Sequence, residues 1–376
     1  MRSQFKHIRR LVLKVGSSLL ADPDSGIRTQ QIQQIAKTVH ELKKRNIEVA
    51  IVSSGAVALG RVRLAWLDQD LSLHKKQAAA AVGQPMLMHA YADIFQNMDM
   101  TVAQMLLTRD DLSNRRRYLN ASHTSQTLFR AGAVPIVNEN DTVMTEEIRF
   151  GDNDTLGAMV SLLVHADLFV MMTDVDGLYT ANPHHDPHAQ RLGIVQEITD
   201  DISSMAQGAG SSFGTGGMQS KVKAARISTK GGIPAVIMTG QDPLQLFSLL
   251  DGQNIGTVFA CGKDRQSRRQ HWIADILEPK GKVWITKETA KMIQTNNKGV
   301  LHQHMIRVEG QFDKGDCIDI YDDEHRIIAC GLANYRSDEI KNLLHLQGQD
   351  IQGILGYRDF ESVIHQDNLV MRPVSN

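Results

Sequence analysis

The chain has 376 residues, of which 42% are hydrophobic and 22% charged, and its formal net charge at pH 7 is −1. This length exceeds what one hydrophobic core usually serves, so two domains are expected. A nearly neutral chain has no overall attraction for nucleic acid or membranes, and we expect neither as a partner. The three cysteines form no CxxC pair and leave an odd count, which favours a reducing compartment and predicts a cytoplasmic protein.

The first apolar run carries a lysine. Residues 11–15 have the pattern of a buried strand with Lys14 inside it, and a Gly-Ser-Ser turn follows at 16–18. The run is too short for a secretory signal or a membrane span. A lysine in a buried strand is costly without an anionic partner, so Lys14 is a candidate for anion binding.

Helical and strand patterns then alternate as far as residue 259. Apolar residues recur at helical spacing over 29–45 and 76–95. Nearly continuous apolar runs predict strands at 47–52, 102–107, 133–137, 167–172, 235–238 and 255–259, the last expected to close the sheet. Because such runs are typical of strands buried on both faces, they predict an α/β fold with an open, mainly parallel sheet sandwiched between helices.

Small or polar residues follow three of these strands. They are Ser53-Ser54-Gly55-Ala56, Asn138-Glu139-Asn140-Asp141 and Thr173-Asp174-Val175-Asp176-Gly177. Ligands bind at the carboxyl ends of strands in open parallel sheets, so these strand ends predict one shared site.

A glycine-rich turn at 214–217 leads into a helical pattern over 218–229 that carries Lys221. Glycines can expose backbone N–H groups to an anion, and the helix directs the positive end of its dipole toward the same place. The combination favours binding of a nucleotide polyphosphate, with Lys221 as an additional positive charge.

The composition changes after residue 261, where basic residues crowd a polar stretch. Short strand patterns separated by Gly and Asp turns then follow at 282–286, 305–309, 317–321 and 327–332. We expect an α/β domain over 1–262, a linker over 263–278, a β-rich domain over 279–357 and a C-terminal tail over 358–376.

These motifs together resemble a known family. In chain order they are Lys14-Val15-Gly16-Ser17-Ser18, Ser53-Ser54-Gly55-Ala56, Asn138-Glu139-Asn140-Asp141, Gly151-Asp152-Asn153-Asp154, Thr173-Asp174-Val175-Asp176-Gly177-Leu178-Tyr179 and Gly214-Thr215-Gly216-Gly217-Met218 with Lys221. The set resembles the amino-acid kinase family, and within it the branch that phosphorylates glutamate. The β-rich segment resembles a PUA domain, a small pseudo-barrel that many bacterial members of this branch carry.

The resemblance implies a role for each matching residue. It implies catalytic residues Lys14, Lys221 and Asp154; ATP-binding residues Lys14, Thr173, Asp174, Thr215, Gly216, Gly217, Met218, Gln219, Ser220 and Lys221; and substrate-binding residues Ser54, Gly55, Asp141 and Asn153. Asp154 would organise the lysines or the metal. Asp141 would pair with the ammonium group of the amino acid, and Ser54, Gly55 and Asn153 would offer hydrogen bonds to its carboxylate oxygens.

The implied reaction is ATP-dependent phosphorylation of the glutamate side-chain carboxylate, the first step of proline biosynthesis. The cofactors would be ATP and Mg²⁺, with few protein ligands to the metal because Mg²⁺ keeps several waters. The resemblance also implies feedback inhibition by proline, a homo-oligomer and glutamyl phosphate reductase as a partner enzyme.

Two alternatives stay open. The chain could be a kinase for another small acidic amino acid, such as aspartate or acetylglutamate, although the PUA-like domain argues against it. It could also be an RNA-binding regulator that acts through that domain. The full set of phosphate-site residues, Lys14 and Lys221 above all, argues against the second alternative.

Overall fold

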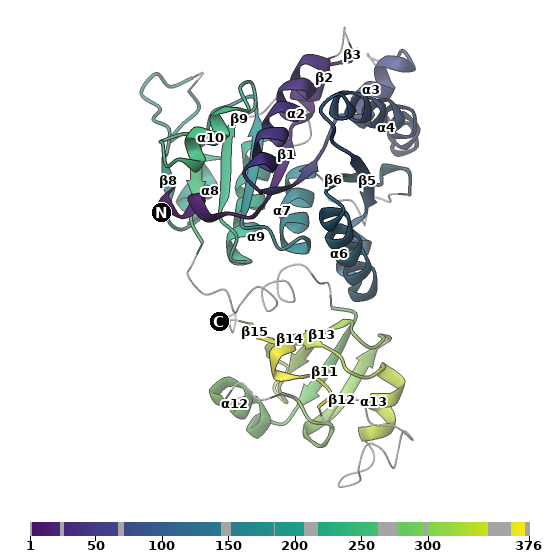
Figure 1. Ribbon diagram of the computed structural model, residues 1–376. Helices are drawn as coiled ribbons and strands as arrows, with labels where there is room; N and C mark the ends of the chain where they lie inside the picture. The colour runs from purple at the N-terminus through teal and green to yellow at the C-terminus, as the bar shows by residue number, and fades with distance from the viewer. Residues whose placement is uncertain are drawn as a thin grey trace. The chain divides into compact units, whose positions relative to one another are not determined.

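The computed structural model describes residues 2–22, 26–66, 71–143, 152–183, 185–206, 217–261, 277, 279–296, 299–344 and 362–372. The chain divides into two compact units (Figure 1). The first unit comprises residues 1–112 and 119–263, and the second comprises residues 113–118 and 264–376. Among the described residues, no helix is both long and apolar enough to cross a membrane.

The first unit is built on an eight-stranded sheet with the order β5-β6-β4-β1-β7-β9-β10-β8. Its strands are β1 (Arg10–Val15), β4 (Glu48–Val52), β5 (Val102–Leu107), β6 (Val134–Glu139), β7 (Leu168–Thr173), β8 (Ile194–Val195), β9 (Ala235–Thr239) and β10 (Thr257–Phe259). All neighbours are parallel except β9 and β10. The predicted mainly parallel sheet is confirmed. The prediction that residues 255–259 close it is wrong, because β8 pairs with the outer side of β10.

Helices cover both faces of this sheet (Figure 1). On one face α2 (Thr29–Lys44), α4 (Leu73–Gln96) and α10 (Gln245–Leu250) share a hydrophobic core with the strands. On the other face α7 (Asn153–Leu163) packs on β1 and β7, and α9 (Met218–Lys230) packs on α7 and β9. The remaining elements before residue 264 are η1 (Arg2–His7), α1 (Ser17–Leu20), β2 (Ala21–Asp22), β3 (Gly26–Ile27), α3 (Ala56–Arg63), α5 (Arg109–Ser113), α6 (Arg115–Arg130), η2 (Asp141–Val143) and α8 (Asp200–Met205). The end of α5 and the start of α6, within residues 113–118, are grouped with the second unit.

The alternation of side chains along β1 decides where its lysine lies. Leu11, Leu13 and Val15 belong to the core shared with α2 and α4. Because successive side chains of a strand point to opposite faces, Lys14 lies on the other face, under α7. All residues of α7 from Asp154 to Leu163 are buried, so this lysine is enclosed between a central strand and a buried helix.

Two glycines set the position of α4 against α3. A Cβ atom on Gly60 of α3 would overlap the carbonyl oxygen of Ala79, and one on Gly83 of α4 would overlap that of Ala56. The two helix backbones therefore approach more closely than larger residues would allow. This contact fixes where α4 lies against α3, and α4 extends the side chains of Gln84 and Tyr91 to the ends of two strands.

The second unit contains a five-stranded sheet with the order β12-β11-β13-β14-β15. The strands are β11 (Gly281–Ile285), β12 (Met305–Gly310), β13 (Cys317–Tyr321), β14 (Ile327–Leu332) and β15 (Leu369–Met371), with α12 (Lys287–Asn296), η4 (His302–His304), α13 (Ser337–Leu344) and η5 (Gln366–Asn368). It has its own core, which includes Val283, Ile320 and Tyr335. The range expected as a C-terminal tail contains β15, which pairs antiparallel with β14.

Candidate active site

Four neighbouring strands, β6, β4, β1 and β7, end at the same edge of the sheet. Lys14 of β1 is level with Val52 of β4 and Met171 of β7, and Val52 is level with Val137 of β6. The residues that follow these strands therefore gather at one carboxyl edge, where parallel sheets bind ligands.

Three predicted catalytic residues form one buried ion cluster at this edge. Lys14 Nζ lies 2.5 Å from Asp154 Oδ1, and Lys221 Nζ lies 3.2 Å from Asp154 Oδ2. Only 5% of Lys14, none of Asp154 and 5% of Lys221 is exposed. Two cations that would repel each other are thus held together by one carboxylate.

The environment favours the ionised form of the carboxylate. Burial would raise the pKa of Asp154, but the charges of Lys14 and Lys221 outweigh burial and hold that pKa below its ordinary value. Burial lowers the pKa of Lys221, and the charge of Lys14 lowers it further, while Asp154 opposes both. The three ionised groups sum to one positive charge in a buried place, which suits an anionic ligand.

Two helix N-termini direct their dipoles toward the cluster. Asp154 lies in the first turn of α7, where Asp152 caps the helix by accepting from the Thr155 amide at 2.6 Å. Burial raises the pKa of Asp152 above its ordinary value, whereas the pKa of Asp154 lies below its ordinary value. Lys221 lies in the first turn of α9, whose N-cap is Gly217. A helix N-terminus with a glycine cap leaves its backbone N–H groups available to phosphate oxygens.

Ser220 adds a contact that the sequence did not predict. Its hydroxyl donates to Asp154 Oδ2 at 2.7 Å and is also 2.8 Å from the Gly217 carbonyl oxygen. The serine therefore ties the start of α9 to the carboxylate of α7. Thr215 and Gly216, predicted to bind ATP, lie outside the described residues.

The small residue Gly157 lets α7 approach the lysine. A Cβ atom on Gly157 would lie 2.8 Å from the ring of Phe169 and 3.3 Å from Lys14 Cβ. No larger residue fits there without moving the ring or the lysine. The sequence shows this glycine only as one small residue in an apolar helix, so its role could not be predicted.

One of the residues predicted to bind the amino acid, Asn153, lies next to the ion cluster in the sequence. Asn153 precedes Asp154 in α7, and its Nδ2 donates to the Ser53 carbonyl at 2.8 Å and to Ser54 Oγ at 3.0 Å. Gly55 caps α3 with a φ of 98°, a left-handed conformation that favours glycine. Asp141 begins η2, two residues after the end of β6 at Glu139. The structure thus brings Asn153 and Ser54 into contact, with Gly55 next in the chain.

The other predicted nucleotide residues lie at the ends of β7 and α9. Thr173 is the last residue of β7, and its hydroxyl donates to the exposed carboxylate of Asp174 at 2.8 Å. The Gly16 amide donates to the Met172 carbonyl oxygen at 3.1 Å, so the turn after β1 lies against the end of β7. Met218 is partly buried and Gln219 is exposed in the first turn of α9.

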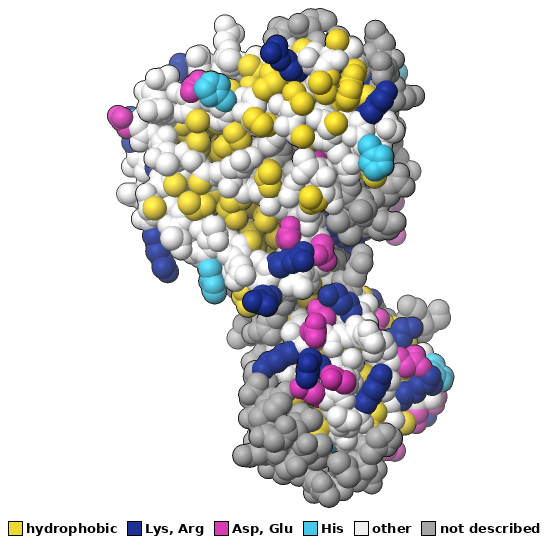
Figure 2. Space-filling model, turned by 90° about the vertical axis from the view of Figure 1, so that its right-hand side faces the viewer, with side chains coloured by type: hydrophobic (Ala, Val, Ile, Leu, Met, Phe, Trp, Pro, Cys, Tyr) yellow, Lys and Arg dark blue, Asp and Glu magenta, His cyan; other side chains and the backbone are white. Residues whose placement is uncertain are grey.

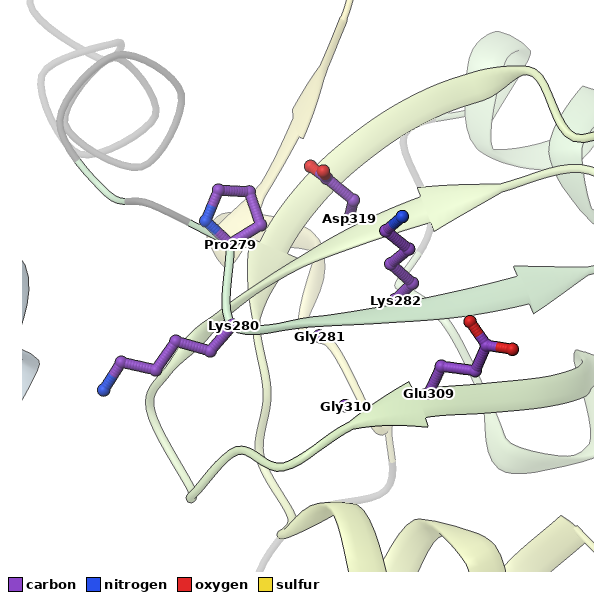
Figure 3. A pocket seen from close by; sticks show the side chains of 7 residues that line it. All are labelled: Pro279, Lys280, Gly281, Lys282, Glu309, Gly310 and Asp319. Carbon is purple, nitrogen blue, oxygen red and sulfur yellow. The ribbon is translucent and has the colours of Figure 1, made fainter.

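A hollow of about 270 Å³ on the second unit shares no residue with this site. It is lined by Pro279, Lys280, Gly281, Lys282, Glu309, Gly310 and Asp319. The charged side chains of Lys280, Lys282 and Glu309 extend in different directions rather than converging (Figure 3). A ligand site needs convergent polar groups, so this hollow is not a second candidate.

An open, mainly parallel sheet with two lysines and a carboxylate between them at its carboxyl edge is the arrangement that the resemblance to the amino-acid kinases implied. The model of the amino acid kinase family matches residues 9–239, and the model of the PUA domain matches residues 281–355.

Curated relatives narrow the class. The glutamate 5-kinase of Geobacter sulfurreducens is 43% identical over 97% of this chain and 98% of its own length. Those of Citrifermentans bemidjiense and Trichlorobacter lovleyi are each 43% identical, over 97% and 98% of this chain and 98% of their own lengths. The chain therefore belongs to the glutamate 5-kinases of the amino acid kinase family, and the resemblance inferred from its motifs is confirmed.

Proposed function

We propose that the chain transfers the γ-phosphoryl group of ATP to the side-chain carboxylate of glutamate. The product would be glutamyl 5-phosphate, and the reaction would be the first step of proline biosynthesis. The observation that carries the proposal is the buried cluster of Lys14, Asp154 and Lys221 at the start of two helices. Membership in the glutamate 5-kinases supports the choice of acceptor.

The chemistry requires positive charge more than it requires a base. The acceptor carboxylate is already deprotonated at neutral pH, so no group needs to remove a proton. Attack on the γ-phosphoryl group brings two anions together and spreads charge over the equatorial oxygens. Lys14 and Lys221 supply fixed ammonium groups for this charge, and Asp154 holds both in place before the substrates arrive.

Mg²⁺ bound with ATP would neutralise part of the charge of the phosphate groups. Both oxygens of Asp154 already contact ammonium groups, so Asp154 suits organisation of the lysines better than direct ligation of metal. Asp174, exposed at the end of β7, is the carboxylate that suits contact with a hydrated metal ion. Within the described residues, no group of three or more His, Cys, Asp or Glu is placed to hold a metal.

The amino acid would bind beside the cluster, between the ends of β4 and β6. We assign the substrate ammonium group to Asp141 and the substrate carboxylate to Ser54 and the backbone at Gly55. Asn153 uses its Nδ2 in bonds to the protein, so the atom left for a ligand is its carbonyl oxygen. An acceptor suits the ammonium group, which differs from the donor role first expected for Asn153.

The proposed partners are inferred from the family, and the proposed homo-oligomer is also supported by an exposed apolar surface. We propose a cytoplasmic homo-oligomer inhibited by proline, whose product is used by glutamyl phosphate reductase. Hydrophobic side chains spread over the face of the first unit on the side of α3, α4 and α6 (Figure 2). Met86 of α4 and Leu119 of α6 are 37% and 42% exposed, and β5 lies at the sheet edge. Exposed apolar residues beside an edge strand favour contact with another copy.

An RNA-binding regulator is not favoured as the function, because the relatives that match 97% of this chain are kinases.

The acceptor is tested by trapping the acyl phosphate. The full chain is incubated with ATP, Mg²⁺, hydroxylamine and, separately, glutamate, aspartate or acetylglutamate, and the hydroxamate is measured. We expect product with glutamate at a kcat/KM at least about tenfold above that with the other acids. Product with aspartate or acetylglutamate alone would overturn the assignment of the acceptor.

A further inference from the structure

Helix α4 sends two buried polar side chains toward the substrate edge of the sheet. Gln84 Oε1 accepts from Asn138 Nδ2 at 2.7 Å, and the Tyr91 hydroxyl lies 3.2 Å from Ser53 Oγ. Gln84 and Tyr91 are seven residues apart, so they lie on one face of the helix, two turns from each other. Each reaches a strand end that carries proposed substrate residues, β6 for Gln84 and β4 for Tyr91.

The hydrogen bonds fix which way each amide faces. The backbone N–H of Glu139 donates to Asn138 Oδ1 at 2.9 Å, and a backbone N–H can only donate. The oxygen of Asn138 must therefore face Glu139, and its Nδ2 must face Gln84. This nitrogen needs an acceptor, so Gln84 has to present its oxygen.

The same oxygen of Asn138 also contacts Asn153, a residue assigned to the amino-acid site. Asn138 Oδ1 lies 3.0 Å from Asn153 Nδ2 and is a third acceptor beside the Ser53 carbonyl oxygen and Ser54 Oγ, so the two N–H groups of Asn153 are shared among three acceptors. These acceptors hold the amide nitrogen of Asn153 toward the protein. Among the described residues no hydrogen bond uses Asn153 Oδ1, and this oxygen is left for a ligand.

The two polar atoms of Gln84 differ, because its oxygen has a hydrogen-bond partner and its nitrogen has none among the described residues. Gln84 is 9% exposed, and its Nε2 is buried without an acceptor among the described residues. A buried unpaired donor is costly, and methionine would occupy a similar volume without that cost. Glutamine at this position is therefore explained by its acceptor, which fixes Asn138.

We propose that Gln84 is a positioning residue of the amino-acid site, which fixes the amide of Asn153 through Asn138. The inference rests on the proposed function, because it takes Asn153 as a residue that contacts the substrate. Without the Gln84 acceptor, Asn138 would turn or pair with water, and Asn153 would lose one of the three acceptors that hold its amide nitrogen toward the protein.

The test is steady-state kinetics of the full chain with three variants at residue 84. Gln84→Met removes the acceptor at similar volume, Gln84→Asn shortens the side chain so that its oxygen no longer reaches Asn138, and Gln84→Glu keeps an oxygen there. Gln96→Met is the control, because Gln96 is exposed at the end of the same helix. The glutamate KM, the ATP KM and Tm are measured for each.

We expect Gln84→Met and Gln84→Asn to raise the glutamate KM by about tenfold, the scale of one lost hydrogen bond, with the ATP KM unchanged. Gln84→Glu and Gln96→Met should stay within about twofold of the parent. If Gln84→Met does not fold, Gln84→Asn decides. A parental glutamate KM in the folded loss variants, or an equal rise of both KM values, would overturn the role of Gln84. If the parent used another acid, the proposed function would fail, and the same comparison made on that acid would still decide the role of Gln84.

Discussion

Lys14 and Lys221 are buried cations that both form an ion pair with the carboxylate of Asp154. Asp154 lies 2.5 Å from one ammonium nitrogen and 3.2 Å from the other, with no exposed surface. Ammonium groups that a buried carboxylate already holds in place need little reorganisation when the phosphoryl group transfers, which is the main electrostatic advantage of an enzyme site over water.

Loss of Lys221 tests that advantage. Lys221→Ala should lower kcat by about 10²-fold or more, because a charge partner of the transition state is removed. Lys223→Ala is the matched control, since Lys223 is exposed on the same helix and should leave kcat unchanged. The measurement is hydroxamate formation at saturating ATP and glutamate. A Lys221→Ala enzyme within a few-fold of the parent would remove this lysine from the reaction.

The protonation of Lys221 gives a second residue-level prediction. Burial lowers the pKa of Lys221 from its ordinary 10.5, and the charged ammonium is the form that stabilises the transition state. Activity should therefore be full below the pKa of the folded enzyme and decline as pH rises through it, beginning below 10.5. The pH profile of kcat between pH 7 and 10.5 checks this. A profile that stays flat to pH 10.5, in an enzyme shown to remain folded, would contradict it.

The residues assigned to bind the amino acid give a third residue-level prediction. Asp141→Ala and Asn153→Ala should each raise the glutamate KM far more than the ATP KM, because they remove groups assigned to the amino acid. Both KM values are measured on the same preparations, with Tm as the check on folding. A rise confined to the ATP KM would show that these residues serve the nucleotide.

Lys14 and Lys221 could be proposed from the sequence, because a lysine in a buried strand is costly without an anionic partner and a glycine-rich turn before a helix favours phosphate. The role of Asp154 came only with the family resemblance. Gln84 has no such signal, because a glutamine in an alanine-rich helix is usually a solvated residue. Its role depends on the close contact of α3 and α4 and on the amide of Asn138, and both exist only in the folded chain.

At the scale of elements, strands with continuous apolar runs were predicted to within a residue or two. β5, β13 and β14 have the predicted bounds. β8 and β15, with two and three residues, were missed because a strand this short is defined by its neighbour rather than by its own pattern. The antiparallel pairing of β10 was also missed, since direction depends on the path of the preceding loop.

The packing of α7 on β1 and β7 makes an element-level prediction. Gly157→Ala places a methyl group 2.8 Å from the Phe169 ring, so we expect about 1–3 kcal/mol lower stability and a lower kcat through displacement of Lys14. Thermal unfolding and kcat are measured together. Adding Phe169→Leu should recover part of the activity by making room. Unchanged stability and kcat in Gly157→Ala would contradict the close contact.

At the scale of the whole molecule, the core of the first unit is built from residues before 259, and the second unit has a core of its own. Every residue assigned to catalysis or substrate binding precedes residue 279. The domain boundaries proposed at 262 and 279 therefore separate the chemistry from the β-rich module.

Deleting residues 279–376 should leave a folded protein that still forms the acyl phosphate, with kcat within about tenfold of the full chain. Assembly or inhibition by proline can change, because contacts between domains often set such properties. Circular dichroism and the hydroxamate assay check the truncated chain beside the full chain. An insoluble or inactive truncation, with the full chain active, would show that the boundary is misplaced.

The most direct measurement is the position of the phosphoryl group on glutamate. The full chain is incubated with ATP, Mg²⁺, hydroxylamine and glutamate labelled with ¹³C at the side-chain carboxyl carbon, and the product is followed by ¹³C NMR. We expect the labelled carbon to become the hydroxamate carbon, because the acceptor is the side-chain carboxylate. A hydroxamate at the unlabelled α-carboxyl carbon, or ATP consumption without any hydroxamate, would contradict the assignment of this chain as a kinase for the glutamate side chain.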